Sequence, residues 1–404
     1  MNIINALMSR DTSTLSSPKE WLSALFSSES YSGVNVTTKR AMEHTAVYDC
    51  VNIVSESIAS LPISVYKTEI RSSKTFNKKD TQHQLYHILH DEPNPDMTSF
   101  SFFQLLMVHL LLRGNFYAQI VRNNAGVITG IYPLDNEKMK VVRLDSGRIG
   151  YIYTSSYGEV GLDASEVLHY IGMSLNGIVG ISAIAYNRHT IGASIAMETF
   201  GSTLFKNGAN PSGVVSGKEV TKMSDTAFKR FKESFKEAYQ GLMNAGKPLI
   251  LEDGYTFTPI TISNKDGQFI ESRKFTKAEI ASIFRVPPHM INELDKATFS
   301  NIEQQSIDFV TNAIRPWCIR IEQETKRKCF TATEKKSYYV KFNMGALLRG
   351  DTLTRYQAYE SAITKACWMN RNEARELEDL NPVDGLDDML VPLNFGKDKQ
   401  NATN

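Results

Sequence analysis

Three histidines, His83, His87 and His90, come nearest in this chain to a set of residues that could do chemistry. They are four and three residues apart, so on one helix they would share a face, as helical zinc ligands do. Neither a cysteine nor a well-placed glutamate completes a closed set around them. We therefore prefer the simpler interpretation, three partly exposed histidines on a short helix that ends before Pro93, to a metal site.

Two other groups of residues invite a catalytic interpretation. The segment Gly172-Met-Ser174-Leu-Asn176 is one residue short of a nucleophile elbow, because asparagine stands where the last glycine is needed. Three carboxylates cluster near the C-terminus, but a two-metal nuclease draws its ligands from several elements, and one local cluster is more typical of a solvated loop. These carboxylates are Asp384, Asp387 and Asp388. With no phosphate loop of the Walker type in the sequence, we expect no catalytic site, no cofactor and no bound metal.

The composition is that of an ordinary globular protein of 404 residues, with 42% hydrophobic and 22% charged residues. Lys+Arg number 45 and Asp+Glu 44, giving a formal net charge of +1. Because phosphate neutralisation supplies most non-specific affinity for DNA, this balance argues against a tight grip on DNA over the whole surface. It is compatible with a surface past which DNA slides. Four scattered cysteines suit a reducing compartment, and no apolar run is long enough for a membrane span.

Apolar spacing predicts the elements of the first half of the chain. One helix ends at Pro62, and its apolar stripe is Val47, Val51, Val54, Ile58 and Leu61. A strand Ile63–Tyr66 follows, and a second helix runs from a cap at Thr98 or Ser99 to Gly114. Short β-type runs come next, with hairpin turns at residues 124–126 and 145–147. We therefore expect residues 45–175 to form one α+β domain.

Helices dominate the prediction for the second half. We expect one from about Ser182 to Phe205 and one that begins at Ser224 or Asp225, with a phenylalanine stripe on one side. Another helix, from about residue 267 to 286, ends at Pro287-Pro288. The last long helix begins near Ser300, and its seam is Ile307, Val310, Ile314, Trp317 and Ile321. Pro316 lies inside that pattern and should kink the helix, with a plain helix end at Arg315 as the alternative.

Six segments between residues 45 and 393 carry a resemblance to a known family. In order they are AVYDCVNIVSESIASLPISVY, LYHILHDEPNPDMTSFSFFQLLMVHLLLRGNFYAQI, NGANPSGVV, AGKPLILEDGYTFTPI, IASIFRVPPHMI and TRYQAYESAITKACWMNRNEARELEDLNPVDG. Each segment is weak alone, but their order over most of the chain is specific. The chain resembles the portal proteins of tailed bacteriophages, in the Hong Kong-97-type family.

The resemblance implies a structural protein and not an enzyme. The implied assembly is a homo-oligomeric ring of about twelve subunits at one capsid vertex, through which double-stranded DNA passes non-specifically during packaging and ejection. The implied partners are the terminase large subunit, which would carry the ATP-driven motor on a separate chain, the major capsid protein, a head-completion or adaptor protein, and a scaffold. The implied location is the virion, with the host cytoplasm during assembly and no membrane.

The family's parts can be carried over element by element. Residues 1–44 have no counterpart and are expected to be a mobile N-terminal arm. The remaining expectations are a wing (residues 45–223), a first stem helix (224–240, with Asp225–Gln240 helical), a clip (241–267), a second stem helix (268–286), a tunnel loop (287–300), a kinked helix with a returning wing strand (301–350), a crown (351–393) and a disordered tail (394–404).

A ring repeats each side chain in every subunit, so a few lysines per chain can give a positive rim without a basic sequence. The residues expected to line the DNA tunnel are Lys229, Lys232, Lys236, Arg273, Lys274, Lys277, His289, Asn292, Glu293, Asp295, Lys296 and Thr298. Those expected to dock partners at the clip are Asn244, Lys247, Glu252, Asp253 and Tyr255. An ordinary solvated face is the alternative for any one of these lysines.

Two other functions are carried as alternatives to the portal. The first is a metal-dependent hydrolase or nuclease that uses the histidines at 83, 87 and 90 or the carboxylates between residues 384 and 388. The second is a prophage-derived interaction module that no longer assembles into a ring.

Overall fold

The computed structural model describes residues 30–71, 74–206, 213–217, 224–226, 228–230, 232–233, 255–259, 265–292, 299–347, 352–378 and 380–390. Two compact units make up the chain, Met1–Asn343 and Met344–Asn404. Most of the expected N-terminal arm and all of the expected tail (394–404) lie outside the described residues.

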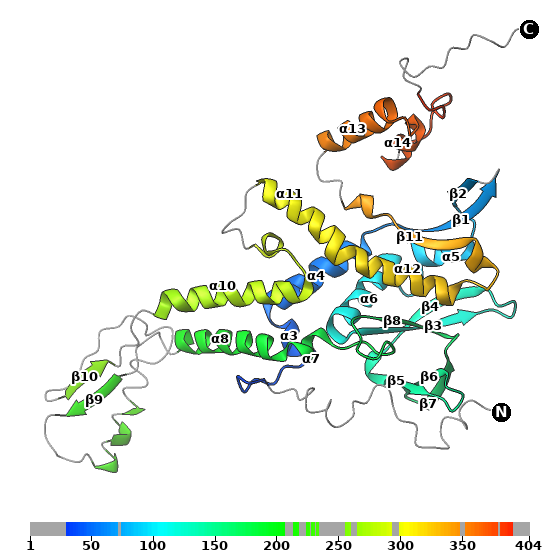
Figure 1. Cartoon of the computed structure of the whole chain (residues 1–404). Helices are drawn as coiled ribbons and strands as arrows, with labels where there is room; N and C mark the ends of the chain where they lie inside the picture. Colours follow the sequence, from blue (N-terminus) through cyan, green and yellow to red (C-terminus); the bar gives the residue numbers. More distant parts are fainter. Residues whose placement is uncertain are drawn as a thin grey trace, which may run out of the picture. The chain divides into compact units, whose positions relative to one another are not determined.

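Antiparallel sheets form the β part of the first unit (Figure 1). One has the order β11-β1-β2, from Tyr338–Phe342, Ile63–Arg71 and Lys74–Lys79. A second has the order β4-β3-β8, from Ile128–Leu134, Asn115–Arg122 and Val167–Ile171. A third has the order β5-β6-β7, from Met139–Arg143, Ile149–Ser155 and Gly158–Asp163. A pair, β9 and β10, joins Gly213–Gly217 to Tyr255–Pro259.

The described chain also contains many helices. Those of the first unit are α3 (Thr38–Met42), α4 (Thr45–Ala59), α5 (Gln84–His90), α6 (Ser99–Arg113), α7 (Ala183–Tyr186), α8 (Arg188–Lys206), α10 (Lys265–Phe284), α11 (Phe299–Asp308) and α12 (Arg315–Cys329). Short helical turns are η1 (Asn136–Lys138), η3 (Pro288–Ile291), η5 (Glu334–Lys336) and η6 (Met344–Ala346), and η4 (Phe309–Ile314) and η7 (Ser361–Lys365) are π-helical. The expected α+β class is confirmed. Within the described ranges, no helix has the length and apolarity to cross a membrane.

The core of the first unit lies where α4 packs against α6. The predicted stripe of α4 is buried, with at most 4% of any of its five side chains exposed, Leu61 included. Helix α6 has the predicted ends: the Thr98 side chain accepts from Ser101 N, and Gly114 closes the helix with φ +76°. Edge-to-face aromatic contacts join this helix to two sheets. The ring centroids of Phe102 and Phe116 are 5.5 Å apart, and those of Phe103 and Phe342 are 5.4 Å apart.

Glycines allow the backbone to pack closely where α6 passes into β3. A Cβ on Gly114 would stand 2.2 Å from the carbonyl oxygen of Ile181, and a Cβ on Gly180 would stand closer still to the oxygen of Gly114. The amide of Gly172 donates to that same Gly114 oxygen at 2.8 Å. Since any side chain would force these segments apart, the glycines fix where the chain enters α7 and α8.

A buried amide ties the same junction together. Asn115 Oδ1 accepts from Gly180 N at 2.7 Å and from His169 Nε2 at 3.1 Å, and its Nδ2 donates to Gly180 O at 2.8 Å. Tyr151 OH bonds the other ring nitrogen of His169 at 3.2 Å. Because each polar atom in this group has a partner, the burial of the group costs little.

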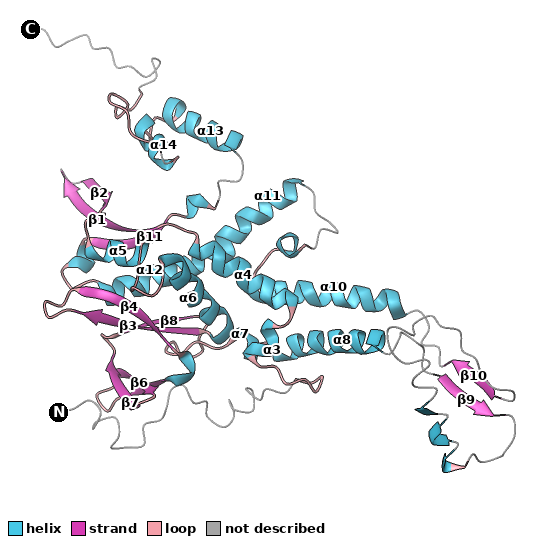
Figure 2. Ribbon diagram, turned by 180° about the vertical axis from the view of Figure 1, so that it is seen from behind, coloured by secondary structure: helices cyan, strands magenta, loops and turns pink. Residues whose placement is uncertain are grey.

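The two long helices α8 and α10 lie side by side, as both views show (Figure 2). The sequence predicted Asp225–Gln240 as the first stem helix, and of that range the structure describes residues 225–226, 228–230 and 232–233. The described pieces of 225–233 are helical, but Phe228 of their predicted apolar stripe is 57% exposed. In α8, by contrast, Ile191 and Ile195 are buried. Within the described part of the chain, both α8 and α4 pack on α10.

The second unit is a small helical body of α13 (Thr352–Glu360), η7 and α14 (Arg371–Leu377). Asn370 and Glu373 form a capping box at the start of α14. Glu378 then joins the two helices, because it lies 2.8 Å from Arg355 Nε and accepts from Tyr359 OH at 2.9 Å. This unit contains most of the residues that were expected to form a crown.

We expect Gly114→Ala to lower the free energy of unfolding by about 2–4 kcal/mol, because it adds both a left-handed alanine and a clash with backbone. Gly126→Ala is the matched control: its φ is +80°, but a Cβ there meets nothing within 4 Å. It should cost only about 1 kcal/mol. Urea midpoints of the two variants measure the difference, and equal shifts would show that the close approach at Gly114 has no energetic weight.

Burial, aided by the charges of Lys328 and Arg327, lowers the pKa of His169 from 6.5 to about 3. Between pH 6.5 and 3 the unfolded chain therefore binds a proton that the folded chain does not. Stability should fall as the pH is lowered through this window, by up to about 1.4 kcal/mol per pH unit. Unfolding midpoints between pH 6.5 and 5 measure this slope, and His169→Gln should make it shallower. An unchanged slope in that variant would rule out His169 as its source.

Candidate functional site

The three histidines do not form a common site. His83 caps α5, where its Nδ1 accepts from Leu85 N at 3.1 Å, whereas Asp91 accepts from His87 Nδ1 at 2.9 Å and from His90 Nδ1 at 2.7 Å. These bonds, that of His90 first, lower the pKa of the Asp91 carboxyl. Among the described residues, no group of three histidine, cysteine or carboxylate side chains is placed to hold a metal ion.

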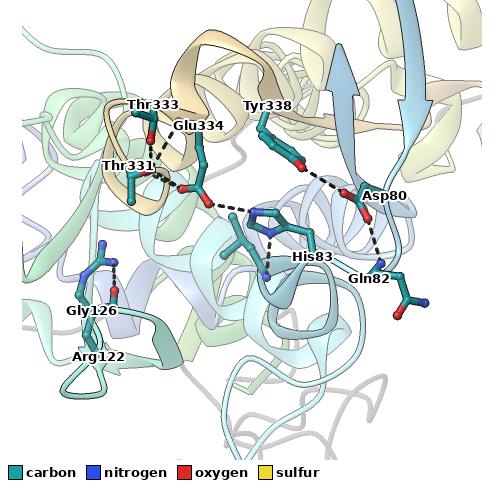
Figure 3. Close-up of polar contacts among 10 residues, drawn as sticks. Asp80, Gln82, His83, Arg122, Gly126, Thr331, Thr333, Glu334 and Tyr338 are labelled. Atoms are coloured by element: carbon teal, nitrogen blue, oxygen red, sulfur yellow. Dashed lines mark hydrogen bonds and ion pairs between the residues drawn. The ribbon is translucent and has the colours of Figure 1, made fainter. Parts of the chain in front are cut away.

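His83 instead takes part in a polar junction between α5, η5 and β11 (Figure 3). Its Nε2 lies 3.4 Å from Glu334, which also accepts from Thr331 N at 2.8 Å. Burial acts to raise the pKa of Glu334, but the bonds from Thr331 and His83 outweigh it and the pKa is lowered. Beside it, Tyr338 OH donates to Asp80 at 3.3 Å. The junction joins segments far apart in the sequence, and its role is structural.

The other catalytic candidates also have local roles. Ser174 Oγ donates a hydrogen bond to Val179 O at 2.6 Å and accepts one from Gly177 N at 3.0 Å. The segment that resembled a nucleophile elbow is therefore a loop closed by its own hydrogen bonds. Asp387 accepts from Asn372 Nδ2 at 2.9 Å, and Asp384 and Asp388 are exposed. Among the described residues, none of these groups is placed to hold a metal ion.

A more organised site lies where α10 ends. Arg285 has φ +57°, a left-handed conformation that is unfavourable for a side chain larger than glycine. It turns the chain into Pro287-Pro288 and the short helix η3. Val286 and Ile291 on either side of the turn are 3% and 6% exposed, so packing holds the turn in place. We call Arg285–Asn292 the loop base, because residues 293–298 of the expected tunnel loop follow it directly.

The long helix meets the loop base at a place dictated by Pro316. Proline has no N–H, so the carbonyl of Asn312, four residues earlier, loses its helical donor. The helix accommodates this with the π-helical segment η4 and continues into α12 without leaving the helical region. A helix end at Arg315 is therefore excluded. Arg285 Nη1 donates to the free Asn312 carbonyl at 3.1 Å and so joins the two elements.

A second bond ties the loop base to α11. Gln305 Oε1 accepts from His289 Nδ1 at 2.7 Å, and His289 is half-buried. Asn292 closes η3 in the left-handed conformation, with φ +61°. The chain thus enters the segment 293–298 from a fixed point and leaves it into a helix that is bonded to the same point.

The seam predicted for the long helix is only partly buried. Val310, Ile314 and Ile321 are at most 8% exposed, but Ile307 is 48% exposed and Trp317 is half-buried. The π-helical segment adds a residue to one turn, so a strict three-four spacing does not continue through it on one face.

The expected tunnel residues have different surroundings. Lys229 and Lys232 are exposed, while Lys277 is half-buried beside a cavity of about 70 Å³ between α4, α8 and α10. Arg273 and Lys274 lie on α10, whose backbone alone is described there. Tyr255 begins β10. The expected residues outside the described part of the chain are Lys236, Asn244, Lys247, Glu252, Asp253, Glu293, Asp295, Lys296 and Thr298.

Three residues of this site were missed from the sequence: Arg285, Gln305 and Asn312. A signal existed for Asn312, because it stands four residues before a proline inside a helical pattern. Nothing in the local sequence identifies Arg285 or Gln305, since their partners lie 27 and 16 residues away.

Comparison with known proteins gives this arrangement a context. The family model described as "Phage portal protein" matches residues 45–379. The portal protein of Enterobacteria phage HK97 is 29% identical over 355 residues, covering 87% of this chain and 82% of that protein. The probable portal protein of Streptomyces phage phiC31 is 34% identical over 384 residues, covering 91% and 81%.

Solved structures show the same fold at lower identity. A chain from the neck of a native gene transfer agent particle, computed with C12 symmetry, has a TM-score of 0.59 at 21% identity and covers 94% of this chain and 99% of its own. A Hong Kong-97-family phage portal protein from Corynebacterium diphtheriae has a TM-score of 0.57 at 16% identity, covering 78% and 98%.

The loop base yields a stability prediction. Arg285→Ala should lower the free energy of unfolding by about 1 kcal/mol, because the bond to the Asn312 carbonyl is lost. Arg285→Gly loses the same bond but removes the left-handed strain, so it should cost less. Urea midpoints, with hydrogen exchange of residues 285–292, would show this order. The reverse order would mean that strain at this residue is unimportant.

Proposed function

Because the chain belongs to the phage portal protein family, we propose that it assembles into a closed ring and forms the channel through which DNA enters and leaves a phage-type capsid. The observation that carries this proposal is the family match, which is continuous over residues 45–379. The similar neck structure has C12 symmetry, which supports a ring of twelve copies here. Heterologous contacts that close on themselves would build such a ring.

The stem of each subunit would be the helix pair α8 and α10. We propose α8 in place of the Asp225–Gln240 helix predicted from the sequence, because α8 is a long helix that packs on α10. The clip would then be the chain between them, residues 207–264, which includes β9 and β10 and the docking residues expected from the sequence. The second unit would be the crown, and the sheets with α4, α5, α6 and α12 the wing.

The segment 287–298 would be the loop that faces the channel. The bonds of Arg285 to Asn312 and of His289 to Gln305 support this assignment, because they tie the start of the loop to the helix that follows it. Its contacts to DNA would be non-specific and made to phosphates, which carry no sequence information. Lys229 and Lys232, exposed on the chain between α8 and α10, would contribute positive charge.

The partners would divide among these parts. The clip would dock the terminase large subunit during packaging and a head-completion or adaptor protein afterwards. The wing would contact the major capsid protein, and a scaffold would bring ring and shell together in the host cytoplasm. The protein itself would be structural, with ATP hydrolysis on the terminase chain.

The two alternatives have less support. A metal-dependent hydrolase would need His83, His87 and His90 to converge, and their bonds hold them apart. A prophage-derived module that does not assemble is compatible with the fold of one chain, and the mass of the protein in solution distinguishes it from the portal.

Deleting Asn292–Ala297 tests the channel. The ring should still form, because the side-chain bonds of Arg285 to Asn312 and of His289 to Gln305 lie outside the deletion, but nuclease-protected DNA per capsid should fall to a small fraction of the parent's. Replacing residues 293–298 by a Gly-Ser segment of equal length is the matched control, which keeps the span and removes the side chains. Normal packaging by both variants would remove this loop from the DNA path, and loss of the ring would place it in a subunit interface.

A further inference from the structure

The hairpin β1–β2 concentrates positive charge in a chain that is nearly neutral. Residues 67–80 hold five basic and two acidic side chains, and both acids are engaged: Glu69 lies 3.5 Å from Lys67, and Asp80 accepts from Tyr338 OH and Gln82 N. We call residues 67–71 and 74–79 the basic ribbon. Its basic residues are Lys67, Arg71, Lys74, Lys78 and Lys79.

The strand register places like charges directly opposite each other. Lys67 is paired with Lys78, and Arg71 with Lys74. Like charges at directly opposed positions are unfavourable in a hairpin. Glu69, which lies on the same face as these two pairs, offsets one of their four positive charges, so the face keeps a net positive charge. The exposed Lys78 has no ion pair within the described part of the chain.

The basic ribbon extends beyond the sheet that carries it. Strand β11 pairs with β1 only as far as Lys67, and β1 continues to Arg71 with β2 as its strand partner (Figure 1). Strand β2 is the outer strand of this sheet. Two apolar side chains are exposed on the ribbon, Ile70 at 78% and Phe76 at 49%. They occupy opposite faces, because Phe76 is paired with Glu69 and Ile70 with Thr75.

From these observations we propose that the basic ribbon is a contact site for duplex DNA, separate from the channel. A two-stranded ribbon has the width that the major groove admits, and its cations would neutralise phosphates of both flanking strands. The exposed Ile70 and Phe76 can contact thymine methyl groups and sugars without reading a sequence. An added protein strand is a poorer occupant, because lysines on an outer strand oppose edge-to-edge pairing. The site would hold DNA that lies against the outside of the ring.

Closed circular duplex DNA is the probe that separates this site from the channel, because a circle cannot be threaded. The variant Lys74→Glu with Lys78→Glu turns both like-charge pairs into opposite-charge pairs, so the fold should be at least as stable as the parent's. Its binding to the circle at 50 mM salt should be weaker by at least about tenfold, and its salt slope shallower by about two. The matched control is Lys39→Glu with Arg40→Glu, the same charge change at exposed positions of α3, which should bind as the parent does.

Several results would overturn the proposal. They are absence of binding between the parent protein and the circle, unchanged binding by the ribbon variant, and an equal loss in the α3 control. If polyglutamate displaced the circular DNA as effectively as linear duplex DNA of equal charge, the ribbon would be assigned to an acidic protein instead. Electron micrographs of the same samples report ring formation independently, so a failure here is distinguishable from a failure of the proposed channel.

Discussion

The amide hydrogen that Pro316 lacks is the constraint on which the arrangement of the helical half depends. Without it the Asn312 carbonyl has no helical donor, the helix takes up the π-helical segment η4, and the free carbonyl is met by Arg285. Arg285, whose own backbone is left-handed at the end of α10, donates this bond from its Nη1. The hydrogen bond from Arg285 to Asn312 thus connects the long helix to the turn that begins the proposed tunnel loop.

A second constraint fixes the other end of the helix pair. Gly114, Gly180 and the buried amide of Asn115 bring the end of α6, strand β8 and the start of α7 and α8 to one point. Helix α8 therefore starts from a rigid place, and α10 returns beside it to the loop base. Two rigid ends joined by a pair of packed helices suit a part that must hold its position while a polymer moves past it.

Local patterns were sufficient for much of the fold. Helix α4, helix α6 with its caps at Thr98 and Gly114, and the hairpin turns at Gly126 and Gly147 follow from apolar spacing, a capping side chain and glycines with positive φ. The pairing of β1 with β11 could not be predicted, because Ile63 and Phe342 are brought together only by the core between them. The exposed Phe228 shows the same limit: periodicity indicates that a helix has an apolar face and not what covers it. The resemblance to portals supplied the family, while the loop base became visible only in the structure.

In the proposed function, the basic ribbon and the tunnel loop would let a chain with a net charge of +1 handle DNA. Charge is placed where an assembled ring would repeat it and is balanced elsewhere. Everything therefore depends on whether the protein forms a ring. The most direct test is the native mass of the purified full-length protein, with electron micrographs of the same sample. Our account predicts closed rings of about twelve copies with a central opening. A protein that stays monomeric, even with its capsid protein present, would contradict it.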